Sequence, residues 1–132
     1  MKISKQFEFS MGHVLNNYEG KCHRLHGHNY QLEVTVESSQ LDSSGFVMDF
    51  SDLKAIVTPL INAELDHHFW VYVKDSRARA LIELGARSVA FEPTAENIVS
   101  YFETVISKEL PDGVTLAQIE LYETSNSKAV LI

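Results

Sequence analysis

The chain has 132 residues, which fits a single domain spanning residues 1–132. Its formal net charge of −7 at pH 7 argues against nucleic acid as a partner. One cysteine cannot form an internal disulfide, the N-terminus lacks the features of a signal peptide, and no apolar run is long enough to span a bilayer. These observations predict a cytoplasmic protein that has no contact with a membrane.

Two alternating stretches predict the first two strands. Polar and apolar residues alternate along Ile3–His13 and again along Tyr30–Glu37. His26 and His28 share the phase of the apolar residues in the second stretch. If the two strands pair antiparallel, His13, His26 and His28 lie on one face near the same end.

Three imidazoles on one face suggest a metal centre. Neutral imidazoles could fill three of the four tetrahedral positions of Zn²⁺ and leave the fourth open. The alternative is that His13 is a core histidine and that His26-Gly27-His28 is an ordinary turn. Three histidines in phase, with a cysteine close by in the sequence, favour the metal.

The only cysteine of the chain, Cys22, lies just before these histidines. Its neighbours Lys21, His23 and Arg24 place positive charge around it, a setting that favours the thiolate. A metal beside a base or nucleophile is an arrangement typical of enzymes, so Cys22 is a candidate catalytic residue.

Helices are predicted in the middle of the chain. Apolar residues at helical spacing follow Ser51, which predicts a helix capped by that residue. Pro59 conflicts with this helix, because proline removes a backbone donor and should kink it. A short second helix is predicted over Ser76–Leu84, with Gly85 as its stop. The clearest helical stripe follows Pro93-Thr94.

Two further strands are predicted over Val114–Glu123 and Lys128–Ile132. With the first two strands they predict an α+β fold, in which one four-stranded antiparallel sheet has helices on one face. Within the third strand the apolar phase slips, which a bulge near Ala117 or Gln118 would explain.

After this slip, Glu123 shares the face of Ile119 and Leu121. A carboxylate on an apolar face needs a partner. The alternative, which the sequence favours equally, is that the strand ends there and Glu123 is solvated.

Asp66 and His67 follow the first long helix. An aspartate next to a histidine could orient the imidazole for proton transfer. Adjacent positions do not establish that geometry, and a polar helix end is the alternative. Because His68 repeats the histidine, either imidazole could be the base.

Several short motifs, in order along nearly the whole chain, resemble the 6-pyruvoyltetrahydropterin synthase / 6-carboxytetrahydropterin synthase family. Each motif alone is weak, except the block of cysteine and histidines. Together the motifs are highly specific. They are Phe9-Ser10-x-x-His13, Cys22-x-x-x-His26-Gly27-His28-Asn29-Tyr30, Gly45-x-x-x-Asp49-Phe50, Leu65-Asp66-His67, Pro93-Thr94-x-Glu96-Asn97 and Glu123-Thr124.

The resemblance implies the tunnelling fold (T-fold), in which the sheets of several subunits close into a barrel. It implies a homo-oligomer, usually a hexamer, with active sites between subunits. It also implies zinc as cofactor and 7,8-dihydroneopterin triphosphate as the small-molecule substrate.

The resemblance also implies roles for individual residues. His13, His26 and His28 match the family's zinc ligands, and Cys22 matches its catalytic cysteine. The other matches are Asp66 and His67 with the proton relay pair, Glu123 with the acid that anchors the pterin ring, and Thr94 with a residue that lines the pterin pocket from a neighbouring subunit.

Within the family, the gap of three residues between Cys22 and His26 resembles the bacterial 6-carboxytetrahydropterin synthases of queuosine and deazapurine biosynthesis. This implies a lyase that forms 6-carboxytetrahydropterin and releases triphosphate and acetaldehyde. The chain departs from the family in two places. Phe69-Trp70-Val71 stands where Leu-Asn is common, and the stretch Trp70–Glu92, longer than in compact members, could reshape the pocket rim or a subunit contact.

Three other functions stay open. One is formation of 6-pyruvoyltetrahydropterin by the same opening steps, another is non-catalytic binding of a pterin or a metal, and the third is a cysteine hydrolase that uses Cys22 and His67. Lys21 and Arg24 are candidates for contacting the triphosphate, and surface solvation is the alternative for each.

Overall fold

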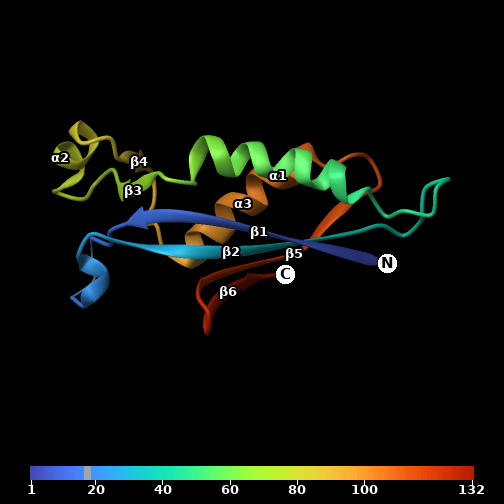
Figure 1. Cartoon of the computed structure of the whole chain (residues 1–132), viewed down its shortest axis with the longest axis horizontal. Coiled ribbons are helices and arrows are strands. Elements are labelled where there is room, and N and C mark those ends of the chain that lie inside the picture. The colour runs from blue at the N-terminus through green and yellow to red at the C-terminus, as the bar shows by residue number, and fades with distance from the viewer. Residues whose placement is uncertain (17–18) are drawn as a thin grey trace.

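In the computed structural model, which describes residues 1–16 and 19–132, a twisted sheet carries two long helices on one face (Figure 1). The strands of the described chain form one sheet in the order β4-β3-β1-β2-β5-β6. The strands are β1 Lys2–His13, β2 His26–Glu37, β3 Phe69–Tyr72, β4 Arg87–Val89, β5 Thr115–Thr124 and β6 Ser127–Leu131. The helices are α1 Phe50–Glu64, α2 Ala78–Glu83 and α3 Ala95–Glu109, with a short 3₁₀ turn, η1, at Lys21–His23.

The two alternating stretches form the antiparallel pair β1–β2, as predicted. Phe7, Phe9 and Met11 are buried, whereas the residues between them are exposed. In the register of this pair, His13 lies opposite His26, and Met11 lies opposite His28. Residues 17 and 18 of the loop that joins the strands lie outside the described residues.

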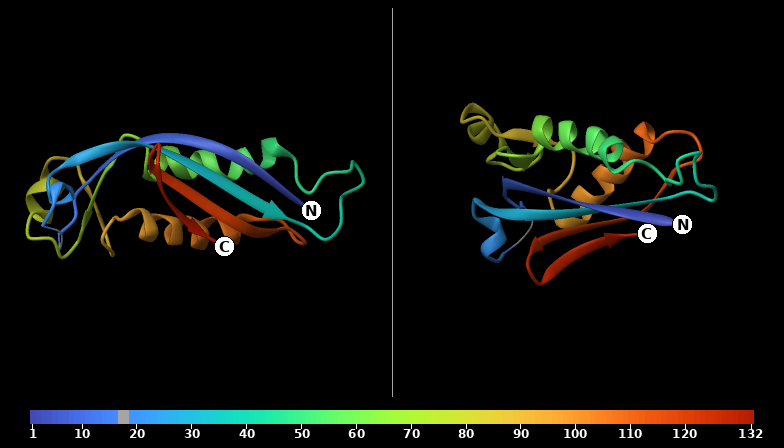
Figure 2. Two further views of the ribbon diagram at one scale, coloured as in Figure 1. Left: turned by 90° about the horizontal axis from the view of Figure 1, so that it is seen from below. Right: turned by 45° about the vertical axis from the view of Figure 1, so that its right-hand side comes forward.

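The two long helices cover the apolar face of the sheet, and Figure 2 shows both on the same side of it. Each buries one stripe of side chains, which drives its packing because each buried aliphatic or aromatic side chain stabilises the fold by about 1.5–3 kcal/mol. The stripes are Leu53, Val57 and Ile61 in α1 and Ile98, Val99, Phe102 and Ile106 in α3. None of the helices in the described chain is long and apolar enough to cross a membrane.

Helix α1 differs from its prediction in two ways. The residue that caps its N-terminus is Asp49, whose carboxylate accepts a hydrogen bond from the backbone N–H of Ser51 at 2.8 Å. The predicted cap, Ser51, is therefore inside the first turn. Pro59 lies within the helix, and the helix continues past it to Glu64.

The prediction of four antiparallel strands is wrong, because β3 and β4 add two strands in parallel pairings. Both are short, and Trp70 and Val71 of β3 are fully buried, so β3 shows no alternation that would mark it as a strand. Helix α2 connects β3 to β4 and confirms the predicted short helix, and Gly85, with a φ of 102°, ends it.

The C-terminal strands contain two irregularities. The register between β2 and β5 shifts between Thr35 and Val36, which leaves Ala117 unpaired and confirms the predicted bulge. A second shift, between Tyr122 and Thr124 in the pairing with β6, leaves Glu123 out of that ladder. Bulges of this kind re-aim side chains next to functional sites.

Candidate metal centre and active site

The three histidines of β1 and β2 converge at one end of the sheet. One ring nitrogen from each of His13, His26 and His28 lies within 4.8 Å of the other two. His13 and His26 lie opposite one another in the strand register, and their Nε2 atoms are 3.0 Å apart. The ring of His28 completes the cluster, with its centroid 5.2 Å from that of His13 and 4.9 Å from that of His26.

Backbone carbonyls orient two of these rings. The Nδ1–H of His13 donates to the carbonyl of Pro93 at 2.7 Å, and the Nδ1–H of His26 donates to the carbonyl of Arg24 at 2.7 Å. A carbonyl can only accept, so the proton of each neutral ring is on Nδ1, and each Nε2 carries a lone pair. The two lone pairs face one another and repel, whereas both would attract a cation placed between them.

Burial lowers the pKa of two of the three histidines, His13 and His28, and so favours the neutral form that binds metals. His13 is 1% exposed, and its pKa is lowered to about 4, mainly by this burial. The hydrogen bond with Pro93 opposes this change, whereas His26 and His28 lower the pKa further. Burial also lowers the pKa of His28, although the carboxylate of Glu123 opposes the change. The Nε2 atom of His28 is buried and finds no hydrogen-bond partner among the described residues, as expected of an atom that a metal ion would satisfy.

Tyr30 is a residue of this site that the sequence analysis missed. Its hydroxyl is buried and lies 3.4 Å from Nδ1 of His13. Its pKa is raised above the usual range, mainly by burial and then by the nearby Glu123 and Cys22. The tyrosine therefore lies near both of these predicted site residues. The signal was present, because Tyr30 shares the phase of His26 and His28.

Cys22 lies in the turn η1 and is half-buried with a free thiol. Its carbonyl accepts a hydrogen bond from the backbone N–H of Leu15 at 3.0 Å. Cys22 is not a member of the cluster of potential metal ligands. Its turn contacts the cluster, because the carbonyl of Arg24, two residues after Cys22, accepts the hydrogen bond from His26.

Glu123 points toward the same site from β5. Its Oε1 lies 3.5 Å from Nε2 of His28, which is long for a hydrogen bond, and its side chain is 24% exposed. Glu123 also lines a small cavity of about 180 Å³ together with Ala95 at the start of α3. The sequence allowed either a carboxylate with a partner or a solvated strand end. The position of Glu123 next to His28 agrees with the first.

Thr94 directly precedes helix α3. Its hydroxyl accepts a hydrogen bond from the backbone N–H of Asn97 at 3.2 Å and so caps the helix. The preceding carbonyl, that of Pro93, orients His13, and the following residue, Ala95, lines the cavity beside Glu123. Thr94 therefore lies next to the site of its own chain.

Asp66 and His67 form a hydrogen-bonded pair. The carboxylate of Asp66 accepts from the Nδ1–H of His67 at 2.9 Å and from the backbone N–H of Ser10 at 2.9 Å, and these bonds, that of Ser10 first, hold its pKa below the usual range. His68 instead donates from Nδ1 to the carbonyl of Asp66 at 3.0 Å. Of the two imidazoles, His67 is the one that the carboxylate orients.

The Asp66–His67 pair lies beside the histidine cluster and is not part of it, and His67 lines one cavity together with His28. The backbone of His67 has a positive φ of 60°, its N–H donates to the carbonyl of Ser10 at 2.7 Å, and its side chain is 84% exposed. The pair is thus fixed beside β1 and contributes no atom to the cluster. The imidazole is therefore at the surface of the chain.

Comparisons with known proteins agree with this site. The family model described as 6-pyruvoyl tetrahydropterin synthase matches residues 2–131. A 6-carboxy-5,6,7,8-tetrahydropterin synthase from Haemophilus influenzae is 38% identical to the chain over 136 residues, which cover 96% of this chain and 94% of that protein.

Solved structures show the same fold. An uncharacterized protein from Wolinella succinogenes aligns with a TM-score of 0.86 and 25% identity, covering 99% of this chain and 97% of that one. The 6-pyruvoyl tetrahydropterin synthase of Plasmodium falciparum aligns with a TM-score of 0.76 and 23% identity, covering 99% and 96%. These likenesses confirm the tunnelling fold, with the strand count corrected to six in the described chain.

Proposed function

The chain belongs to the 6-pyruvoyl tetrahydropterin synthase family, and we propose that it is a 6-carboxy-5,6,7,8-tetrahydropterin synthase. In this proposal it is a zinc-dependent cytoplasmic lyase of queuosine or deazapurine biosynthesis. It converts 7,8-dihydroneopterin triphosphate to 6-carboxytetrahydropterin and releases triphosphate and acetaldehyde. The identity of 38% to a bacterial protein of that name supports this choice of reaction.

The observation that carries the proposal is the convergence of three imidazoles, two of which, those of His13 and His26, direct the lone pairs of Nε2 toward one another. Three nitrogen ligands with a fourth position open are typical of catalytic zinc, and tetrahedral bonds of about 2.0–2.1 Å separate ligand atoms by roughly 3.3 Å. The 3.0 Å between the Nε2 atoms of His13 and His26 is close to that value. When bound, zinc would supply Lewis acidity toward oxygens of the substrate.

The protein's own residues supply the proton transfers. In this proposal the thiolate of Cys22 removes a proton from carbon, since it lies beside the cluster without being one of its ligands. His67, oriented by the carboxylate of Asp66, passes protons to and from the substrate. Because this pair contributes no atom to the cluster and its imidazole is exposed, we propose that it acts in a site shared between subunits of a homo-oligomer, a hexamer by family resemblance.

Glu123 and Thr94 would recognise the pterin. The half-buried carboxylate of Glu123 can accept hydrogen bonds from the amino group and a ring N–H of the substrate. Thr94 lies one residue from the wall of the cavity that Glu123 lines. A ligand without those N–H groups would leave the carboxylate without partners, and this would give the site its specificity.

The test is to incubate the zinc-loaded protein with 7,8-dihydroneopterin triphosphate and to identify the products by mass. We expect 6-carboxytetrahydropterin, acetaldehyde and triphosphate, and no turnover by His26→Ala, which removes a ligand. A product with the pyruvoyl side chain would replace the proposed reaction by the alternative within the family. Substrate binding with no turnover by the zinc-loaded protein would support a non-catalytic pterin-binding role.

The shared site can be tested by mixing two inactive chains. Cys22→Ala and a variant at His67 would each fail alone, and their mixture should regain part of the activity if some interfaces combine the intact Cys22 of one chain with the intact His67 of another. His67→Asn is suited to this, because the side chain of His67 is exposed and asparagine tolerates its positive φ of 60°. A monomer, by light scattering, that still turns over the substrate would rule out the shared site.

A further inference from the structure

A buried ion pair lies just before helix α2. The side chain of Asp75 is fully buried, and its carboxylate accepts three hydrogen bonds from Arg77. Oδ1 accepts from the backbone N–H at 2.9 Å and from Nε at 3.0 Å, and Oδ2 accepts from Nη2 at 2.8 Å. The two-pronged contact with the guanidinium fixes the direction in which its remaining N–H groups point.

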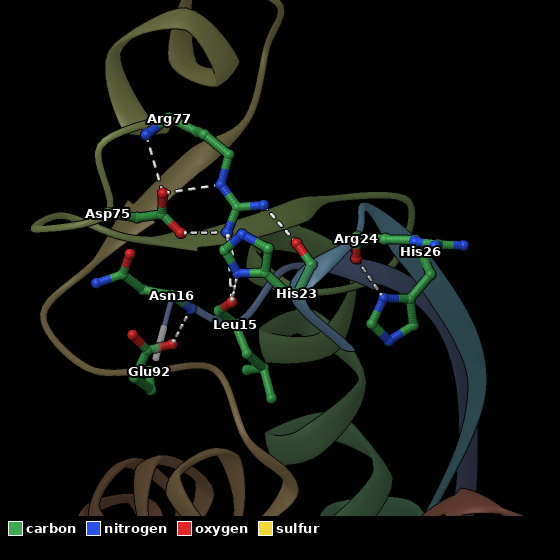
Figure 3. A network of polar contacts seen from close by, with 8 residues as sticks. All are labelled: Leu15, Asn16, His23, Arg24, His26, Asp75, Arg77 and Glu92. Carbon is green, nitrogen blue, oxygen red and sulfur yellow. Dashed lines mark hydrogen bonds and ion pairs between the residues drawn. The ribbon is translucent and has the colours of Figure 1, made fainter. Parts of the chain in front are cut away.

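The remaining donors of Arg77 reach the loop between β1 and β2, as Figure 3 shows. Nη1 donates to the carbonyl of His23, and Nη2 donates to the carbonyl of Leu15 at 3.3 Å. The ring of His23 adds a further bond, from its Nδ1–H to the carbonyl of Leu15 at 3.0 Å. One side chain thus joins the two arms of this loop to the segment that follows β3.

Both of those carbonyls belong to residues next to Cys22 in sequence or in space. His23 follows it directly, and the N–H of Leu15 donates to the carbonyl of Cys22 at 3.0 Å. On the other side of the turn, the carbonyl of Arg24 accepts from Nδ1 of His26. The turn that carries the cysteine is therefore fixed between the Arg77 guanidinium and one of the three clustered histidines (Figure 3).

A second contact ties the same loop to the same segment. The backbone N–H of Asn16 donates to Oε2 of Glu92 at 3.0 Å. Asp75, Arg77 and Glu92 all belong to the stretch Trp70–Glu92. Through these contacts, the stretch Trp70–Glu92 holds the loop that carries Cys22.

We propose that Arg77 is a positioning residue: oriented by Asp75, its guanidinium fixes the turn that carries Cys22 relative to the three histidines. The catalytic consequence rests on the role proposed for Cys22 in the lyase reaction. Lysine cannot replace arginine here, because an ammonium group is a point charge and cannot bind both carboxylate oxygens and two carbonyls in one plane. Displacement of a reacting group by about 1 Å can cost on the order of a hundredfold in rate.

The test compares Arg77→Gln and Arg77→Lys with Arg79→Gln, in which an exposed arginine of α2 is changed. For each zinc-loaded variant we would measure zinc content, kcat, KM, and amide exchange at Leu15 and Arg24, whose N–H groups donate to Cys22 and Lys21. Both Arg77 variants should exchange faster at these amides and lose about tenfold to a hundredfold in kcat. KM should change by less than about twofold and zinc content should not change, because the histidines and Glu123 stay in place.

The control Arg79→Gln should match the wild type in every measurement. Unchanged exchange in the Arg77 variants would show that the guanidinium does not hold the turn, and faster exchange with full kcat would show that the position of the turn does not matter. If Arg77→Lys keeps the wild-type kcat and Arg77→Gln does not, Arg77 acts through its charge and does not position the turn. If the wild type does not turn over, the proposed function fails, and the exchange data still decide whether Arg77 fixes the turn. Should Arg77→Gln not fold, Arg77→Lys, which keeps a positive charge beside Asp75, carries the same test.

Discussion

Gly12 lies where the ring of Phe69 leaves no space for a side chain. It precedes the proposed ligand His13, pairs with Gly27 in β2, and pairs with Phe69 in β3. A Cβ added to Gly12 would be 2.4 Å from Cδ2 of the Phe69 ring, 3.0 Å from its Cε2 and 3.3 Å from the carbonyl oxygen of His26. Atoms at the shortest of these distances overlap, so either the ring or strand β1 must move in Gly12→Ala.

Overpacking of this kind costs about 1–3 kcal/mol of stability. In a chain of this length each kcal/mol lowers the melting temperature by roughly 3–5 °C, so we expect a loss of roughly 3–15 °C. Because the displaced strand carries His13, zinc affinity should fall as well. Thermal unfolding with and without zinc, together with a zinc titration, measures both effects, and the stabilisation by zinc should shrink with the affinity.

Removal of the Phe69 ring tests whether this ring causes the loss of stability in Gly12→Ala. In the background Phe69→Ala the added methyl group has space, so Gly12→Ala should cost less there, with a coupling free energy of roughly 0.5–3 kcal/mol. Gly27→Ala is the contrast, because its Cβ would meet the carbonyl oxygen of Met11 at 3.0 Å, which no side-chain truncation removes. Additive costs for Gly12→Ala and Phe69→Ala, or zinc affinity equal to that of the wild type, would refute this reasoning.

Three further substitutions test separate parts of the site. Cys22→Ala should retain zinc, by metal analysis, and lose turnover, and loss of the metal would instead make the thiol a ligand. Glu123→Ala removes a charge-assisted hydrogen bond worth about 1.5–3 kcal/mol and should weaken binding of a non-reactive pterin roughly tenfold to a hundredfold by calorimetry, with zinc retained; unchanged affinity would contradict pterin recognition by this carboxylate. Asp75→Asn should lower the free energy of unfolding at pH 7. The hydrogen bonds from Arg77 hold the pKa of Asp75 below its usual value of about 3.9, so the ionised form stabilises the fold above that pH, and this stabilisation is lost as pH falls through the lowered pKa. Denaturant titrations should therefore show the difference from wild type shrinking toward pH 3, and a constant difference would contradict the role of the charge.

The histidine cluster could be predicted from the sequence because it depends on a local and regular pattern. The period of two in β1 and β2 sets the face of every side chain, and antiparallel pairing then brings His13 opposite His26. Strand β3 has no such pattern, since Trp70 and Val71 are both fully buried. Its parallel pairing with β1 involves only two positions, Gly12 with Phe69 and His13 with Trp70, and nothing local in the sequence marks them.

What orients the ligands could not be predicted for a different reason. The groups that fix the tautomers of His13 and His26 are the carbonyls of Pro93 and Arg24, and every residue of a chain has a carbonyl. The side chains therefore identify which atoms could bind a metal, whereas the fold determines which nitrogen is free to bind it. The same holds for Cys22. Its neighbours in the sequence can be read directly, but Arg77 lies 54 positions beyond His23. The contact of its guanidinium with the turn could be seen only in the fold, once β3 and α2 were placed.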